Sequence, residues 1–171
     1  LSGEIAPLLD REGLKAAEEA ALEYQGIFGA RYYLEIQRHG IDKEKKVNDG
    51  IPKLHEKLGI PLVATNDFHF LGANDHAAHD ALICIQTGKT VADQNRMCYP
   101  DGLYMKSPKE MQKLFSDLPE AVENTVKIAE QCQVEFEFDT MHLPQFPIPE
   151  GHADEKDYLT HLARQGLVER Y

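Results

Sequence analysis

The stretch IPLVATNDFHF, residues 60–70, is an apolar run that ends in an aspartate and a histidine two positions apart. A nearly continuous apolar run of this kind is typical of a strand whose two faces are both covered. In a strand, side chains at positions i and i+2 point to the same face of the sheet. Asp67 and His69 are therefore predicted to stand together where a buried strand ends.

The residues before this strand predict a strand–helix–strand unit. RYYLEIQ, residues 31–37, is rich in aromatic and aliphatic side chains and predicts a short strand. Apolar residues then recur at helical spacing from Val47 to Leu58, and Gly59 is a helix-stop signal, although Pro52 predicts a kink or a restart. Parallel strands joined in this way place their carboxyl ends on one rim. Polar residues that follow the two strands are thus expected to meet there.

Helical patterns flank this unit. Apolar positions recur at helical spacing over residues 11–29, and the residues beyond Phe70 predict further helices. SPKE at 107–110 predicts a capping box with Pro108 at the first helical position. DLPE at 117–120 predicts a second one, with Pro119 between Asp117 and Glu120. The segment LPQFPIPEG, residues 143–151, has three prolines and predicts an extended linker. The fold class predicted from these signals is α/β, with further helices and an extended linker after the parallel unit.

Composition excludes several classes of function. The formal net charge of −11, from 29 acidic and 18 basic residues, opposes broad electrostatic binding to nucleic acid by this segment. Its three cysteines show no C-x-x-C spacing and fit a reducing compartment. No apolar run approaches the roughly 18 residues of a membrane span, so a cytoplasmic chain without a membrane partner is predicted. The chain begins with leucine and ends inside a helical pattern, which predicts a piece of a longer protein.

Two sets of residues at the rim are candidates for chemistry. Asp67 and His69 could bind a divalent metal such as zinc or manganese or work as an acid–base pair. The structural alternative, in which Asp67 caps a turn and His69 only lies on the rim, is about equally supported by spacing. Glu35 and His39 alternate on the first strand and could point into the same space. For Glu35, an ion pair with a nearby arginine is the favoured interpretation over a role in the site.

Three further residues have structural readings. His76 and His79 are spaced i, i+3 on a predicted helix, but no glutamate lies between them as a metalloprotease H-E-x-x-H requires. They are therefore predicted to be surface or capping residues. Cys84 follows five residues later, and nothing orients a histidine toward it, so a buried thiol is the prediction.

Several segments together resemble one family. YYLEIQRHG, LGIPLVATNDFHF, HDALICIQTGKT, YMKSPKEMQKLFSDLPEAVENTVKIAEQC and HLPQFPIPEG closely resemble consecutive segments of the large subunit of bacterial C-family replicative DNA polymerases. The resemblance covers essentially the whole chain in order. It implies that residues 1–146 form the C-terminal part of a polymerase and histidinol phosphatase (PHP) domain, a partial distorted β/α barrel of TIM-barrel-like type. Residues 147–171 would be a linker and the first helix of the polymerase palm region.

The resemblance also implies a site and partners. The family's last barrel motif, D-x-H, supplies metal ligands and matches Asp67 and His69, so zinc or manganese is expected there in the parent protein, with Glu35 and His39 as possible rim residues. The magnesium-binding catalytic aspartates are expected downstream of Tyr171, which leaves no catalytic residue in this chain. Expected partners are the rest of the large subunit, the proofreading exonuclease subunit and, through the parent, primer–template DNA. The alternatives are a free-standing metal-dependent PHP phosphoesterase related to histidinol phosphatase, and an interaction module that binds no metal.

Overall fold

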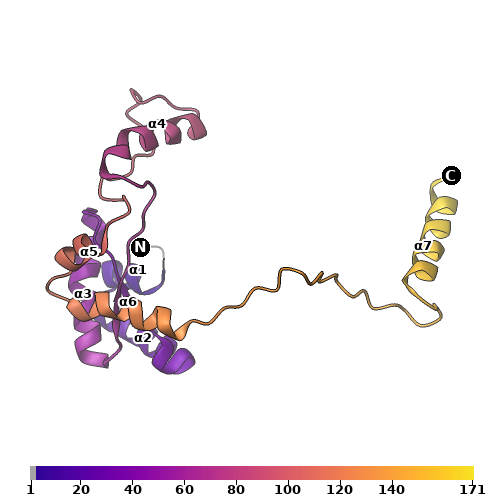
Figure 1. Ribbon diagram of the computed structural model, residues 1–171, viewed down its shortest axis with the longest axis horizontal. Coiled ribbons are helices and arrows are strands. Elements are labelled where there is room, and N and C mark those ends of the chain that lie inside the picture. The colour runs from indigo at the N-terminus through magenta and orange to yellow at the C-terminus, as the bar shows by residue number, and fades with distance from the viewer. Residues whose placement is uncertain (1–2) are drawn as a thin grey trace. The chain divides into compact units, whose positions relative to one another are not determined.

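The computed structural model describes residues 3–171. The chain divides into two compact units, with the boundary in the sequence between Gln133 and Val134 (Figure 1). The elements of the first unit are, in order, α1 (Ile5–Arg11), α2 (Leu14–Phe28), the 3-10 turn η1 (Gly29–Arg31), β1 (Leu34–Ile36), α3 (Asp42–Leu58), β2 (Leu62–Ala64), the 3-10 turn η2 (Ala73–Asp75), α4 (His76–Thr87), α5 (Pro108–Leu114) and α6 (Pro119–Gln131). The second unit contains α7 (Glu155–Arg170). Residues 134–154, which include the predicted linker, form neither helix nor strand.

The strand–helix–strand prediction is confirmed. β1 and β2 pair in parallel, with Leu34 opposite Leu62 and Ile36 opposite Ala64, and α3 connects them. β1 is shorter than the predicted strand at 31–37, because the chain enters it through the turn η1. The described residues form this one two-stranded sheet, so the α/β class holds while the partial barrel remains a prediction.

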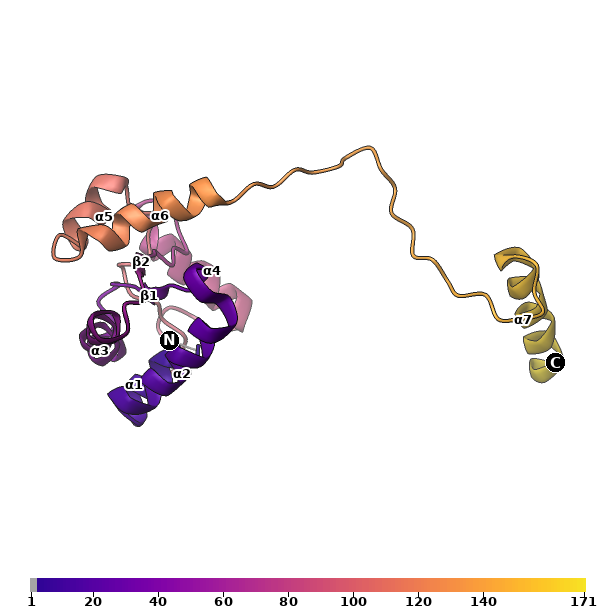
Figure 2. The ribbon, with the colours of Figure 1, turned by 90° about the horizontal axis from the view of Figure 1, so that it is seen from below.

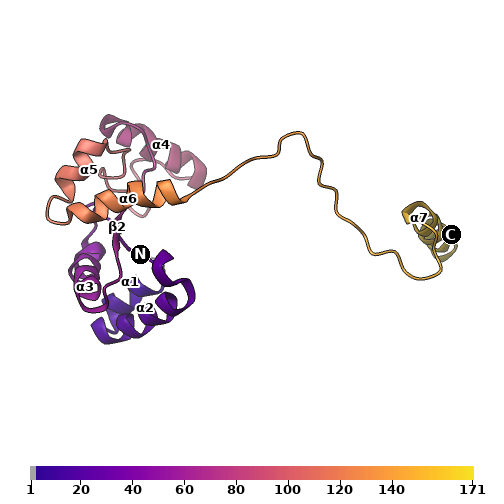
Figure 3. The same ribbon diagram turned by 60° about the horizontal axis from the view of Figure 1, so that its bottom comes forward.

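The buried residues of both strands lie on one face of the sheet, because burial alternates along β1 and β2. The side chains of Leu34, Ile36 and Leu62 are almost completely buried. Figure 3 shows β2 between α3 and α6, and Figure 2 shows α6 next to β2. The Asn124 side-chain amide of α6 donates a 2.7 Å hydrogen bond to the carbonyl oxygen of Leu62, which satisfies a buried backbone group. α3 packs against β1, and α1 and α2 pack against α3.

Helix α3 shows which sequence signals decide its bounds. It contributes Val47, Ile51 and Leu54 to the core from one face, as the spacing predicts. It ends where Gly59 adopts a left-handed conformation with φ 67°, which a residue with a side chain rarely adopts. The helix is continuous through Pro52, so the predicted restart is not found.

Of the two predicted capping boxes, one is confirmed and one is wrong. Ser107 Oγ accepts a hydrogen bond from the Glu110 N–H at 3.3 Å, and Glu110 Oε2 accepts one from the Ser107 N–H at 2.8 Å. Asp117 does not cap α6, whose N-cap is Leu118. The Asp117 carboxylate instead accepts two hydrogen bonds, at 2.6 and 2.8 Å, from the guanidinium of Arg38. A bidentate charged pair has therefore replaced a local cap.

The confirmed capping box predicts a pH dependence of stability. Hydrogen bonds from the Ser107 hydroxyl and the Tyr104 hydroxyl lower the pKa of Glu110 from 4.5 to about 2. Because the folded chain depresses this pKa, the stabilisation is present above pH 4.5 and is lost as the pH falls toward 2. We expect Glu110→Gln to lower the free energy of unfolding at pH 7 and to match the parent chain near pH 2. Urea unfolding at both pH values measures this, with Glu130→Gln, at an exposed position of α6, as the control. A deficit that persists at pH 2 would contradict it.

Candidate metal site at the rim of the sheet

Asp67 and His69 lie side by side, but in the loop after β2 and not in the strand itself. His69 Nε2 is 3.3 Å from Asp67 Oδ2, and the two side chains are 31% and 58% exposed. The His69 N–H donates to the carbonyl oxygen of Leu103 at 2.8 Å, which attaches this loop to the segment before α5. The predicted proximity is therefore found, although the strand alternation used to predict it ends at Ala64.

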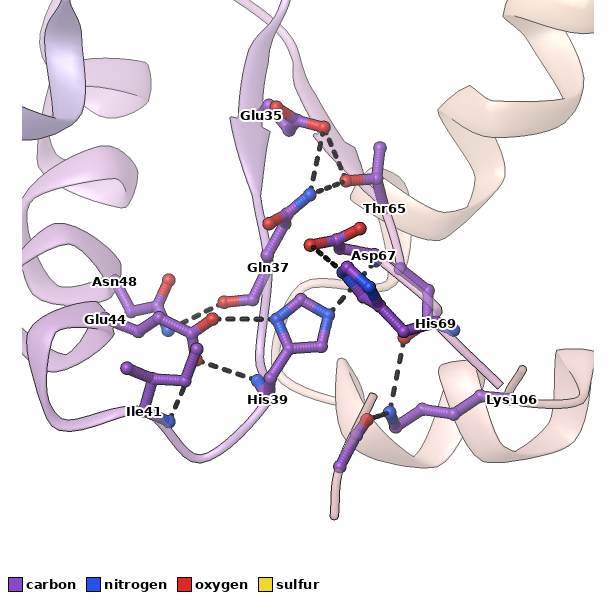
Figure 4. Close-up of polar contacts among 12 residues, drawn as sticks. Glu35, Gln37, His39, Ile41, Glu44, Asn48, Thr65, Asp67, His69 and Lys106 are labelled. Carbon is purple, nitrogen blue, oxygen red and sulfur yellow. Dashed lines mark hydrogen bonds and ion pairs between the residues drawn. The ribbon is translucent and has the colours of Figure 1, made fainter. Parts of the chain in front are cut away.

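His39 reaches the same loop from the end of β1 (Figure 4). Its side chain is 2% exposed and lies between two partners. His39 Nδ1 is 2.8 Å from Glu44 Oε1, and the backbone N–H of Asp67 lies 3.1 Å from His39 Nε2. Because an N–H group only donates, Nε2 must be the unprotonated nitrogen, so Nδ1 carries the proton and donates it to Glu44.

Glu44 is a residue of the site that the sequence analysis missed. It lies in the first turn of α3 and is buried. Its Oε2 accepts hydrogen bonds from the backbone N–H groups of His39, at 2.8 Å, and Ile41, at 3.4 Å. The sequence signal that could have found it is a glutamate in a first helical turn, shortly after a polar strand end that contains a histidine.

Glu35 belongs to a separate polar network on the exposed face of the sheet. Its Oε1 accepts hydrogen bonds from the Thr65 hydroxyl at 2.5 Å and from Gln37 Nε2 at 3.4 Å (Figure 4). Arg31 and Arg38 are the nearby arginines, and Arg38 instead binds Asp117 and donates to the carbonyl oxygen of Leu114. The structure thus places His39 next to Asp67 and keeps Glu35 in contact with strand neighbours.

The two helix histidines are not simple surface residues. The His79 ring lies 5.8 Å from that of His69 and 5.6 Å from that of Tyr99, measured between centroids. His76 Nε2 is 2.8 Å from the carbonyl oxygen of Tyr99. His79 Nδ1 is buried without a hydrogen-bond partner in the part of the chain that the structure describes. The rings of His79 and Tyr99 therefore pack against the ring of His69. Cys84 on the same helix is a buried free thiol, as predicted.

Lys106 is the basic group at this end of the sheet. Its ammonium group donates to the carbonyl oxygen of Gly102 and to Asn66 Oδ1, the latter at 3.2 Å. Partial burial lowers the pKa of Lys106, and the carboxylates of Glu110 and Glu44 act in the opposite direction.

The Asp67–His69 pair has the chemistry and spacing of part of a metal site. Two ligands that are each about 2.1 Å from a tetrahedral metal lie about 3.4 Å apart, close to the 3.3 Å observed. Among residues 3–171, however, no group of three His, Cys, Asp or Glu side chains could hold a metal ion. A cavity of about 200 Å³ beside β1 is lined by Glu35 and Gln37, and neither Asp67 nor His69 lines it. The pair fits a metal only if further ligands join it.

Similarity to known proteins extends over the whole chain. The chain is 41% identical to DNA polymerase III subunit alpha of Treponema pallidum and 39% identical to that of Thermus aquaticus, each over 100% of this chain. It is 43% identical to the Pseudomonas aeruginosa protein of the same name over 98% of this chain. The chain matches a segment of DNA polymerase III subunit alpha. The chain spans 14–15% of the length of these relatives. No protein-family model matches it.

Two structural findings bear on the remaining expectations. No helix within residues 3–171 is both long and apolar enough to cross a membrane. The three cysteines are free, with Cys84 buried and Cys98 and Cys132 exposed.

Proposed function

We propose that this chain is a segment of the alpha subunit of a bacterial replicative DNA polymerase. The observation that carries the proposal is the identity of about 40% to relatives of that name over 98–100% of the chain. The parent protein would extend a primer from deoxynucleoside triphosphates by two-metal phosphoryl transfer in the cytoplasm, using magnesium bound outside this chain. This chain would supply no catalytic residue to that reaction.

Within the parent, we assign residues 1–146 to the C-terminal part of a PHP-type barrel and residues 147–171 to the start of the palm region. Asp67 and His69 would contribute two ligands to a zinc or manganese ion whose other ligands lie outside the chain. Such an ion, when bound, supplies an acidified water or an electrophile for phosphoester chemistry. The close spacing of the two side chains and their partial exposure at the rim support this assignment.

The role of the segment in the assembly is to hold other parts in place. We propose that it supports the rest of the alpha subunit and forms part of the docking surface for the proofreading exonuclease subunit. The parent would bind primer–template DNA through other segments. The net charge of −11 of this chain supports this, since an acidic surface repels phosphates. A free-standing phosphoesterase is not favoured, because the similarity covers the whole chain, residues 134–171 included.

Elemental analysis of the full-length protein, purified without added metal, tests this proposal. We expect zinc or manganese in stoichiometric amount, and the loss of at least one ion in the variant with Asp67→Ala and His69→Ala. Because both side chains are partly exposed, the variant should fold and retain magnesium-dependent primer extension.

A matched control variant carries Asp157→Ala and His152→Ala, which removes another Asp–His pair, with Nδ1 and Oδ2 3.1 Å apart, in the second unit. This variant should keep its metal content. The absence of metal from the unmodified protein would contradict the metal site, and the absence of primer extension would contradict the assignment to a polymerase.

A further inference from the structure

We propose that Glu44 is a positioning residue, which selects the tautomer of His39 and so holds the loop that carries Asp67 and His69. The inference deepens the proposed metal site and rests on that proposed function for its purpose. The hydrogen bonds that carry it are properties of the chain alone.

Glu44 holds His39 at two points. One carboxylate oxygen accepts the backbone N–H of His39 at 2.8 Å, and the other lies 2.8 Å from the ring nitrogen Nδ1 (Figure 4). A carboxylate has no proton to donate, so the nitrogen that faces it must carry one. The hydrogen bond from the backbone N–H fixes the position of the His39 backbone relative to Glu44. The hydrogen bond from Nδ1 fixes the orientation of the imidazole ring and the nitrogen that carries its proton.

The opposite tautomer would be costly at this place. With the proton on Nε2, the ring N–H would face the backbone N–H of Asp67 at a distance of 3.1 Å, which places two donors against each other. The His39 side chain is 2% exposed, so water cannot separate or satisfy these groups. Glu44 therefore selects the tautomer with the proton on Nδ1, whose Nε2 accepts a hydrogen bond from the Asp67 N–H. The tautomer with the proton on Nε2 would repel that N–H group.

Hydrogen bonds consequently hold the loop at the backbone of both Asp67 and His69. The Asp67 N–H is held by His39, and the His69 N–H is held by the carbonyl oxygen of Leu103. Neither attachment uses an Asp67 carboxylate oxygen or a His69 ring nitrogen, so neither competes with a metal for those atoms. Ligands held by such partners lose less freedom when a metal binds.

The first test replaces Glu44 by glutamine in the 171-residue chain. A glutamine amide that donates to His39 Nδ1 requires the proton on Nε2, which would push the Asp67 N–H away. We expect ¹⁵N NMR at about pH 8, where an ordinary imidazole is neutral, to show protonated Nδ1 in the parent chain and a shift toward protonated Nε2 in Glu44→Gln. Exchange of the Asp67 amide hydrogen should become roughly five- to tenfold faster, as expected for one lost hydrogen bond.

Glu110→Gln is the matched control. It makes the same change at the N3 position of α5, where the carboxylate bonds Ser107 and Tyr104 and no histidine. It should leave the His39 tautomer and Asp67 exchange unchanged. Protonated Nε2 in the parent chain, or an unchanged tautomer and unchanged exchange in Glu44→Gln, would overturn the proposal.

A second pair of variants tests it without altering Glu44. The asparagine amide nitrogen of His39→Asn can replace Nδ1 and keep the bond to Glu44, but it offers no acceptor to Asp67. The glutamine oxygen of His39→Gln can replace Nε2 and accept the Asp67 N–H. Asp67 exchange should rise in the asparagine variant and stay within about twofold of the parent in the glutamine variant. Equal acceleration in both would mean that His39 only fills space.

None of these measurements uses a metal. Failure to find metal in the full-length protein would therefore count against the proposed function and leave the tautomer result standing. An altered tautomer with unchanged Asp67 exchange would overturn the positioning role itself.

Discussion

Replacing Phe115 by alanine is expected to lower the free energy of unfolding of the first unit by about 3–5 kcal/mol, as is typical of a phenylalanine removed from a close-packed core. Phe115 is completely buried in the main cluster. The guanidinium carbon of Arg38 lies 4.7 Å from the centre of its ring, so the substitution also removes a cation–π contact. Urea unfolding followed by circular dichroism measures the change.

Phe115→Leu is the control, because it keeps most of the buried volume and should cost less than about 1.5 kcal/mol. The double variant of Phe115→Ala with Arg38→Ala should lose less than the sum of the single losses, since the two side chains share one interaction. A loss below about 1.5 kcal/mol for Phe115→Ala would show that neighbouring residues fill the space left by the ring. Phe115 would then not be what joins α5 to the sheet.

Local signals in the sequence predicted the elements on which the fold depends. The apolar run at β2, the periodic apolar face of α3 with its stop at Gly59, and the Ser107 capping box all involve residues within a few positions of one another. Such signals survive folding because the physical cause, burial or a local hydrogen bond, acts within the element itself. The shared rim also followed correctly from the parallel connection of the two strands.

Contacts between distant residues were not predictable in this way. Asp117 has the spacing of a helix cap, but it binds Arg38, which lies 79 positions earlier in the chain. A bidentate charged hydrogen bond is stronger than a neutral cap, so the distant partner takes the carboxylate. The packing of His79 on His69 is likewise a contact that no helical spacing predicts.

In the candidate metal site, too, the local features were predictable from the sequence and the contacts between distant residues were not. The proximity of Asp67 and His69 was predictable because only one residue separates them. Glu44 was missed because a glutamate in a first helical turn ordinarily caps its own helix, and its additional bond to a histidine ring depends on how the chain enters α3. The third ligand that a metal needs cannot be inferred from this chain, since residues 3–171 do not contain a complete ligand group.

Replacing Gly102 by alanine is the substitution expected to damage the rim most directly. A Cβ atom at this position would lie 2.6 Å from the carbonyl oxygen of His39 and 3.2 Å from its carbonyl carbon. Both are backbone atoms, so rotation of a flexible side chain cannot relieve the clash and the two segments must separate. We expect a loss of about 1–3 kcal/mol in the free energy of unfolding, the usual range for overpacking, measured by urea unfolding.

The position of this clash also predicts where the damage appears. Separation of Gly102 from His39 moves the neighbouring Leu103, whose carbonyl oxygen holds the His69 N–H, and it disturbs the ring that holds the Asp67 N–H. Amide exchange at Asp67 and His69 should therefore accelerate more than exchange in α2. Gly26→Ala is the control, because a Cβ there meets nothing within 4 Å and alanine favours the helix by about 0.5–1 kcal/mol. If Gly102→Ala left both rim amides as protected as in the parent chain, the close approach of the two backbones would not be what holds the rim together.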